Sequence, residues 1–195
     1  MDFSCLKLKN PLRAPLIGDT RELEYNNLTE LNKGWLYGLH MLRILRVNQN
    51  NIGLIRADAW EFCHRLEELD LSFNHLSRLE DWVFAGLSLL QSLNLGDNQI
   101  SHLGEGVFSS LANVRTLVLQ NNKIRTITKR AFEGLMELEN FDLNSSSLLC
   151  DCQLQWLGQW LINSRFQQSC TAVCAHPASL AGSSVLAVKP EEFVC

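Results

Sequence analysis

The sequence repeats itself every 24 residues, and this period constrains the fold more than any other feature. One repeat reads LxxLxLxxNxLxxLxxxxFxxL from Leu66 to Leu87, with asparagine at position 9 and an aromatic residue at position 19. The same eight positions recur in the repeats that begin at Leu42, Leu90 and Val114, and the frame holds without insertion from about residue 18 to residue 143. A fixed period of this length predicts a solenoid.

The LxL core of each repeat predicts a short β-strand. Alternate residues of a strand point to the same side, so both leucines face the interior and the residues between them face solvent. One such strand cannot bury its apolar side alone, whereas stacked repeats form a parallel sheet over one continuous core. An amphipathic helix or coiled coil does not fit, because its period of 3.5 or 3.6 residues is incompatible with LxL followed by asparagine.

The asparagine at position 9 has a structural explanation. The chain must turn out of the sheet inside the core, and a buried amide without a partner costs about 1–3 kcal/mol. Stacked asparagine side chains can bond these main-chain groups, which predicts a ladder. Its members are Asn26, Asn50, Asn74, Asn98 and Asn122. The phenylalanine or tryptophan at position 19 is expected to fill the convex side of each turn.

The pattern weakens at both ends. Gly18 and Arg21 replace the first two apolar positions of the first repeat, so we expect residues 1 to about 22 to be poorly ordered. In the last repeat Ser146 takes the asparagine position. The sequence therefore divides into an unmatched, disordered segment at 1–20, repeats at 21–143 and a different C-terminal segment at 144–195.

Composition and charge exclude several function classes. The 17 Lys and Arg residues against 21 Asp and Glu give a net charge of −4, without the basic stripe that nucleic-acid binding needs. No apolar run approaches the ~18 residues of a membrane span. The five histidines share no face with a nucleophile or carboxylate. We expect no catalysis, no cofactor, no metal site and no small-molecule substrate.

The C-terminal segment is rich in cysteine and begins with an expected helix. Leu154, Leu157, Trp160 and Leu161 have helical spacing, so an amphipathic helix after Cys152 is expected to close the end of the solenoid together with Trp156. Five of the seven cysteines lie here. They indicate disulfides of an oxidising compartment, with a zinc site formed by Cys150, Cys152, Cys170, Cys174 and His176 as the alternative. Four cysteines allow three pairings.

The motif C150-x-C152 with Leu154, Trp156, Cys174 and Cys195 resembles the cysteine-rich C-terminal cap of extracellular leucine-rich-repeat proteins. The segments NNLTELNKGWLYGL, WEFCHRLEELDLSFNHLSRL and NSSSLLCDCQLQWL are similar to the family of leucine-rich repeats and immunoglobulin-like domains proteins. The resemblance implies an α/β solenoid, a leucine-rich-repeat horseshoe with a parallel sheet on its concave face. It also implies the disulfides Cys150–Cys174 and Cys152–Cys195.

Two cysteines are not explained by this pattern. Cys170 is interpreted as an unpaired, partly buried thiol, with an intermolecular link or competition for Cys150 as alternatives. Cys63 stands where other repeats have leucine and is expected in the core, with a disulfide to Cys5 as the alternative.

Residues at repeat positions 3, 5, 7 and 8 are expected to project from the concave face. The central ones are the candidate binding residues. They are Ile44, Arg46, Glu68, Asp70, Phe73, Asn94 and Asp97. Phe73 and Arg46 are expected to act as anchors for a protein partner. The triplets at Asn27 and Asn144 match the N-glycosylation signal and fall at outward-pointing positions, 10 and 7.

The sequence thus predicts a protein-binding module. The family resemblance implies a cell-surface protein that regulates growth-factor receptor signalling, with a receptor ectodomain as the expected partner. No secretion signal is visible at the start, so we interpret the chain as a fragment or isoform of a longer secreted or membrane-anchored protein. The alternative is an intracellular scaffold with reduced thiols.

Overall fold

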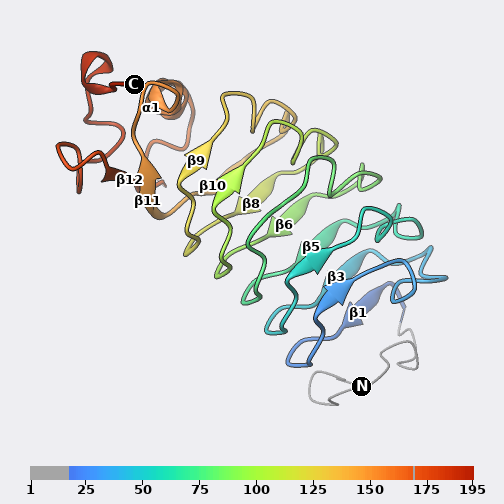
Figure 1. Cartoon of the computed structure of the whole chain (residues 1–195). Helices are drawn as coiled ribbons and strands as arrows, with labels where there is room; N and C mark the ends of the chain where they lie inside the picture. Colours follow the sequence, from blue (N-terminus) through green and yellow to red (C-terminus); the bar gives the residue numbers. More distant parts are fainter. Residues whose placement is uncertain (1–17, 169) are drawn as a thin grey trace.

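The computed structural model describes residues 18–168 and 170–195, which form a solenoid (Figure 1). Six three-residue strands lie side by side in one parallel sheet, in the order β1-β3-β5-β6-β8-β10. The strands are β1 (Thr20–Glu22), β3 (Ile44–Arg46), β5 (Glu68–Asp70), β6 (Ser92–Asn94), β8 (Thr116–Val118) and β10 (Asn140–Asp142). The expected leucine-rich-repeat solenoid with a parallel sheet is confirmed.

Each strand pairs with residues 24 positions away, as the repeat requires. Leu45 lies opposite Leu69, Leu69 opposite Leu93, and Leu93 opposite Leu117. All four leucines have 0% exposure, while the residues beside them in each strand are partly exposed. The sheet therefore has one buried face and one solvent-facing face.

The other side of the solenoid is formed by turns and two small parallel sheets. One pairs β2 (Glu30–Leu31) with β4 (Leu54–Ile55), and the other pairs β7 (His102–Leu103) with β9 (Thr126–Ile127). The aromatic rings of Trp60, Phe84, Phe108 and Phe132 stack beneath these turns, with 6.3–6.5 Å between neighbouring ring centroids. Position 19 thus supplies a second continuous layer of the core.

The position-9 asparagines connect consecutive turns through hydrogen bonds, as Asn98 illustrates. Its side-chain oxygen accepts a hydrogen bond from the main-chain N–H of Leu76 at 3.0 Å. Its side-chain NH₂ group donates to the carbonyl oxygens of Leu71, Leu95 and Gly96 at 3.0–3.1 Å. Asn50, Asn74 and Asn122 repeat this arrangement. Each amide therefore satisfies buried main-chain groups of two turns.

The structure places residues 20–22 of the segment expected to be poorly ordered in a strand, and their order in solution stays a prediction. These residues form β1 and pair in register with β3, and the side chain of Arg21 is buried. Main-chain hydrogen bonds account for this, because a strand can pair without an apolar residue at position 4. The remainder of that expectation, at residues 1–17, lies outside the described residues.

The last turn also differs from the sequence-based expectation. Ser146 is exposed, whereas Ser145 is buried and its hydroxyl donates to the carbonyl oxygen of Ile124 at 3.2 Å. The chain has left the repeat frame here and enters β11 (Ser145–Leu149), which pairs with β12 (Ala172–His176) instead of extending the six-stranded sheet. Serine is too short to repeat the asparagine bonds, so the ladder ends at Asn122.

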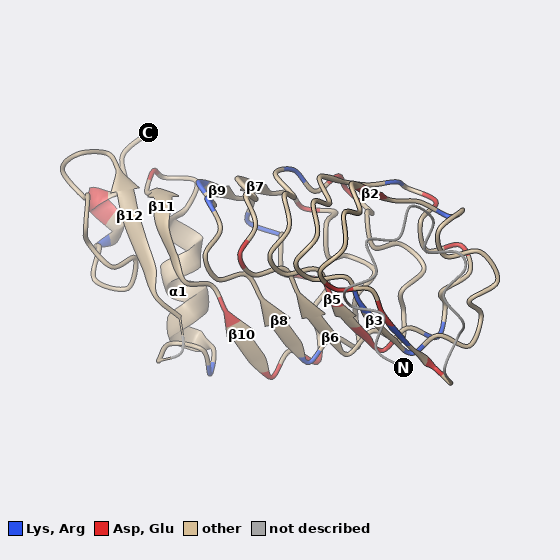
Figure 2. Ribbon diagram, turned by 90° about the horizontal axis from the view of Figure 1, so that it is seen from below, with Lys and Arg blue, Asp and Glu red and all other residues tan. Residues whose placement is uncertain are grey.

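The C-terminal segment closes the core with aromatic side chains. Helix α1 (Gln155–Asn163) lies beside β11 at the end of the solenoid (Figures 1 and 2). The ring of Trp160 lies 5.1 Å from that of Phe132 and 5.6 Å from that of Phe141, while Trp156 lies 6.1 Å from Phe132. The expected amphipathic helix therefore packs on the last turn, which would otherwise expose its core residues.

Two disulfides lie within this cap, and one of them ties its C-terminal tail. Cys150 is bonded to Cys174 with 5.6 Å between their Cα atoms, and Cys152 is bonded to Cys195 with 5.3 Å. The first bond is buried and the second is exposed. The short 3₁₀ helix η2 (Pro190–Glu192) precedes Cys195.

The remaining described cysteines are both buried. Cys63 is a free thiol in the core, and burial raises its pKa to about 12, which keeps it protonated and unreactive at neutral pH. Its alternative partner Cys5 lies outside the described residues. The sulfur of Cys170 belongs to neither disulfide and donates a hydrogen bond to the carbonyl oxygen of Phe141 at 3.4 Å.

The ladder predicts a position-specific loss of stability. Replacing Asn98 with Ala leaves several buried main-chain groups unpaired, so we expect the free energy of unfolding to fall by about 3 kcal/mol or more, at about 1–3 kcal/mol for each group. Asn113→Ala removes one exposed hydrogen bond to the carbonyl oxygen of Ser88 and serves as the control. Chemical denaturation measures both variants, and equal stability of the two would contradict the ladder's role.

The difference in burial predicts the order in which the disulfides are reduced. Thiol–disulfide exchange depends on access to the sulfur atoms, so mild reduction of the native protein is expected to open Cys152–Cys195 before Cys150–Cys174. Differential alkylation followed by mass spectrometry measures this order. Earlier labelling of Cys150 and Cys174 would show that the cap opens by another route. Removing either bond is expected to cost about 2–5 kcal/mol.

Candidate functional site

The concave face, defined by positions 3, 5, 7 and 8 of the six repeats, is the candidate binding site. It carries six acidic residues and one basic residue, Arg46. The acidic residues are Glu22, Glu24, Glu68, Asp70, Asp97 and Asp142. Figure 2 colours the acidic segments of the ribbon red, including one in β10. The structure brings all seven sequence-predicted binding residues onto this face, because they belong to adjacent strands or to the turns that follow them.

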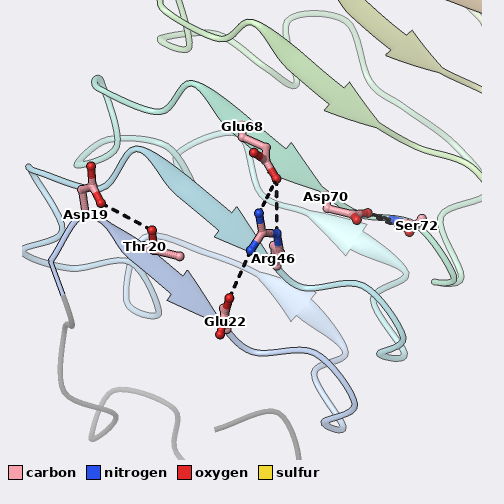
Figure 3. A network of polar contacts seen from close by, with 7 residues as sticks. All are labelled: Asp19, Thr20, Glu22, Arg46, Glu68, Asp70 and Ser72. Atoms are coloured by element: carbon pink, nitrogen blue, oxygen red, sulfur yellow. Dashed lines mark hydrogen bonds and ion pairs between the residues drawn. The ribbon is translucent and has the colours of Figure 1, made fainter. Parts of the chain in front are cut away.

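Arg46 is engaged within the protein (Figure 3). Its guanidinium forms ion pairs with Glu22 at 3.1 Å and with Glu68 at 2.9 Å, on the two neighbouring strands. Hydrogen bonding to Glu68 raises the pKa of Arg46 above its ordinary value. Arg46 therefore neutralises part of the charge on two carboxylates and fixes their position.

The polar residue at position 5 supports the chain where it leaves the strand. The carboxylate of Asp70 accepts hydrogen bonds from the N–H and the hydroxyl of Ser72 at 2.9 and 2.7 Å (Figure 3). Asn94 accepts from the N–H of Gly96 at 3.0 Å, and Asp142 accepts from that of Asn144 at 3.1 Å. These side chains form Asx-type turns, so they have a structural role in addition to any contact with a partner.

Position 8 of the first five repeats adopts the left-handed backbone conformation. The φ angles of Tyr25, Gln49, Phe73, Asp97 and Asn121 lie between 53° and 56°. In the first four, the main-chain N–H still donates to the next repeat, at 2.9–3.3 Å. The chain thus turns sharply while it keeps its bond to the neighbouring turn, and asparagine and aspartate tolerate this conformation better than an aromatic residue does.

Phe73 is the exposed apolar residue at the centre of this position-8 row. On one side, Gln49 donates to the hydroxyl oxygen of Tyr25 at 2.9 Å. On the other, Asn121 donates to Asp97 at 2.9 Å. The side chain of Phe73 stands between these polar pairs with 53% of its surface exposed. An exposed aromatic residue ringed by polar groups is the arrangement found at protein-binding hot spots.

The two glycosylation triplets lie at opposite ends of the repeat array. Asn27 is exposed, and its side-chain oxygen accepts a hydrogen bond from the amide of Asn51. Asn144 is also exposed, at the cap end, where its side-chain oxygen accepts from the N–H of Thr171 at 3.0 Å. Ser146, the third residue of that triplet, is exposed as well.

Other classes of site have little support in the geometry. Cys150, Cys152 and Cys174, three residues of the alternative zinc site, are used in disulfides. Among residues 18–168 and 170–195 there is no cluster of three or more histidine, cysteine or acidic side chains that could hold a metal ion. The same residues contain no helix of the length and apolarity that a membrane span requires.

Comparison with known families identifies the repeats. Residues 22–76, 64–124 and 88–148 match the family described as Leucine rich repeat. The chain belongs to the leucine-rich-repeat family. Residues 171–195 match the Leucine rich repeat C-terminal domain, in agreement with the cap. This leucine-rich-repeat chain is accordingly a protein-interaction module.

Curated relatives confirm the more specific resemblance. Human leucine-rich repeats and immunoglobulin-like domains protein 2 is 55% identical over 58 residues, which are 30% of this chain and 5% of the relative. Protein 3 of the same human family is 58% identical over 52 residues, 27% of this chain and 5% of the relative. The matched segment thus spans only a small part of these relatives.

Among solved structures, human 5T4 (Wnt-activated inhibitory factor 1, trophoblast glycoprotein) has a similar fold. The TM-score is 0.61 at 19% identity, over 87% of this chain and 75% of that one. At this identity the likeness concerns the fold alone.

The sequence analysis did not predict the left-handed backbone conformation at position 8. It also did not predict that the side chain at position 5 supports the turn. Asp97 and Asn121 were a signal for positive φ at position 8, because these residue types favour it. The other repeats have Tyr25, Gln49 and Phe73 there, which do not indicate positive φ. The signal for the supporting role of position 5 was an aspartate or asparagine two residues before a turn.

The backbone conformation predicts the effect of replacing Phe73 on stability. Asparagine adopts positive φ at lower cost, so Phe73→Asn is expected to raise the free energy of unfolding by about 0.5–1 kcal/mol. Leu89→Asn is the control, because Leu89 is similarly exposed at 48% but lies outside the positive-φ positions. Thermal unfolding measures the difference, and a lower melting temperature for Phe73→Asn than for Leu89→Asn would refute the explanation.

Proposed function

We propose that the concave face binds a protein partner through a central apolar contact on Phe73 surrounded by basic side chains of the partner. The observation that carries the proposal is the half-exposed Phe73 ring on a face with six acidic residues and one basic residue. Arg46 positions the carboxylates of Glu22 and Glu68 and does not itself anchor the partner, because its guanidinium already forms ion pairs with both.

The two parts of this surface contribute differently to binding. Burial of an aromatic side chain at the centre of an interface supplies most of the affinity. Carboxylates around it accelerate association with a basic partner and disfavour acidic ones. The charge at the edge of such a contact is screened by salt, so affinity should decrease as ionic strength rises.

We further propose that the module acts at the cell surface and modulates growth-factor receptor signalling. The two disulfides support an oxidising compartment, where such bonds form and persist. The similarity to the family of leucine-rich repeats and immunoglobulin-like domains proteins supports the signalling role. The partner in this proposal is a receptor ectodomain.

Glycans are proposed to limit where that partner can lie. A glycan on Asn144 would stand beside Asp142 and Asn140 at the cap end of the concave face. Asn27 lies at position 10, past the strand, and its glycan leaves the sheet accessible. The central strands β3, β5 and β6 then remain as the open surface.

Surface plasmon resonance against purified growth-factor receptor ectodomains tests this function. Phe73→Asn is expected to weaken the binding of the glycosylated, oxidised protein by about 2 kcal/mol, or about 30-fold in Kd. Trp82→Asn is the matched control, since Trp82 is also an exposed aromatic residue at positive φ but lies outside the concave face.

The proposal predicts that Trp82→Asn binds like the unchanged protein. Equal weakening by both substitutions, or weakening by Trp82→Asn alone, would place the contact elsewhere. If no receptor ectodomain binds, the signalling role is wrong.

A further inference from the structure

The surface beside β7 and β9 carries a local excess of positive charge that the net charge of the chain conceals. We define the β7–β9 face as positions 10, 12 and 13 of the three repeats that begin at Leu66, Leu90 and Val114. All nine residues there are exposed, and none is an aspartate or a glutamate. Its cations and histidines are His75, Arg78, His102, Lys123 and Arg125. Figure 2 shows β7 and β9 on a different side of the solenoid from the large sheet.

The stacking of the repeats places these residues in rows along the solenoid. The N–H of Ser101 donates to the carbonyl oxygen of Ser77 at 3.2 Å, and the N–H of Arg125 donates to that of Ser101 at 2.9 Å. His102 lies opposite Thr126 in the β7–β9 pair, and their side chains form a hydrogen bond at 2.7 Å. Equivalent positions of neighbouring repeats are therefore about 4.8 Å apart, the usual spacing of paired strands.

Two cations of this face have no ion-pair partner among residues 18–168 and 170–195. They are Lys123 and Arg125, which flank the buried Ile124 and are both exposed. Their Cα atoms lie within about 7 Å of each other, because two residues of extended chain span no more. The guanidinium of Arg78, by contrast, pairs with Glu80 at 2.9 Å. Two adjacent positive charges are thus left without compensation on this face.

The residue types of the β7–β9 face indicate a class of ligand. Protein interfaces have an apolar or aromatic core, and the face contains no aliphatic residue, phenylalanine, tyrosine or tryptophan. Single-stranded nucleic acids need aromatic side chains on which bases stack. The face instead combines cations with serine, threonine and glutamine side chains, which form hydrogen bonds with hydroxyl and sulfate oxygens. Exposed clusters of lysine and arginine attract polyanions such as heparin.

We propose that the β7–β9 face binds a sulfated polysaccharide. The side chains of Lys123 and Arg125 contact its sulfate groups, and the polar side chains of the preceding repeats bond its hydroxyl groups along the rows. The separation between cations suits a linear polyanion, whose charges are also distributed along a chain. The β7–β9 face differs from the concave face in position, in sign of charge and in ligand class, so this proposal does not depend on the partner proposed there.

The test uses a heparin decasaccharide as the probe with the full oxidised chain. Isothermal titration calorimetry at about 0.15 M ionic strength is expected to show saturable binding of about one molecule per chain. A hyaluronan decasaccharide, which carries carboxylates and no sulfates, is expected to bind about tenfold more weakly. The absence of saturable heparin binding, or equal binding of the two sugars, overturns the proposal.

Removal of single charges locates the contact. Lys123→Gln and Arg125→Gln are each expected to weaken heparin binding about threefold, the effect of one exposed ion pair. Each is also expected to reduce the slope of log K against log salt concentration by about one. Arg65→Gln is the control, because Arg65 is exposed and unpaired among the described residues but lies at position 24, before the strand. An equal effect of all three substitutions, or no effect of the first two, sinks the proposed site.

Insertion of a negative charge tests the same surface with an isosteric pair. Gln99 lies beside Lys123 in the position-10 row, so Gln99→Glu is expected to weaken heparin binding about threefold. Gln91→Glu makes the same change at an exposed residue of position 2 and is expected to leave binding unchanged. Equal weakening by both would mean that heparin responds only to the net charge of the chain.

Other polyanions complete the experiment. Single-stranded DNA and vesicles that contain phosphatidylserine are each expected to bind more weakly than the heparin decasaccharide. Tighter binding of either one, lost in Lys123→Gln and Arg125→Gln, would assign the face to a nucleic acid or to a membrane and would refute the polysaccharide proposal.

Discussion

The buried asparagine ladder is the interaction on which the rest of the structure depends. Every turn of the solenoid must leave the sheet inside the apolar core, where main-chain groups have no water to bond. One amide, such as that of Asn98, satisfies an N–H and several carbonyl groups from two consecutive turns. Without it, a turn in the middle of the array would bury unpaired polar groups, which lowers the stability of the stacked strands. The ladder thus fixes the 24-residue register.

The functional surface is a consequence of that register. Side chains 24 residues apart become neighbours across the sheet, so Arg46 can reach both Glu22 and Glu68. The turn at position 8 places one side chain per repeat just past the end of the strand, and these side chains form a row. Phe73 is the exposed apolar residue at the centre of that row. Several side chains of this face also have structural roles, because position 5 supports the turn and position 8 adopts positive φ.

The cap solves the problem that a solenoid has at its end. Ser145 replaces the ladder asparagine with a single hydroxyl bond, and the aromatic side chains of Trp156 and Trp160 cover the last turn. One disulfide ties Cys150, at the end of β11, to Cys174 in β12, and the other ties Cys152, before α1, to Cys195 at the C-terminus. Because the cap docks on the last repeat and does not continue it, a cavity of about 920 Å³ lies at their junction, with Thr128 and Trp156 in its wall.

The sequence by itself determined the period, the parallel sheet, the core leucines and the asparagine ladder, because a fixed offset of 24 residues places identical positions beside one another. It also indicated the capping helix through its spacing, and family resemblance supplied the cysteine pairing. Only the tertiary structure decided that Arg46 holds two carboxylates, that Asp70 supports a turn, that Phe73 has positive φ, and that Thr128 and Trp156 share a cavity. These features depend on side-chain conformations and on how the cap docks, and neither leaves a periodic signal in the chain.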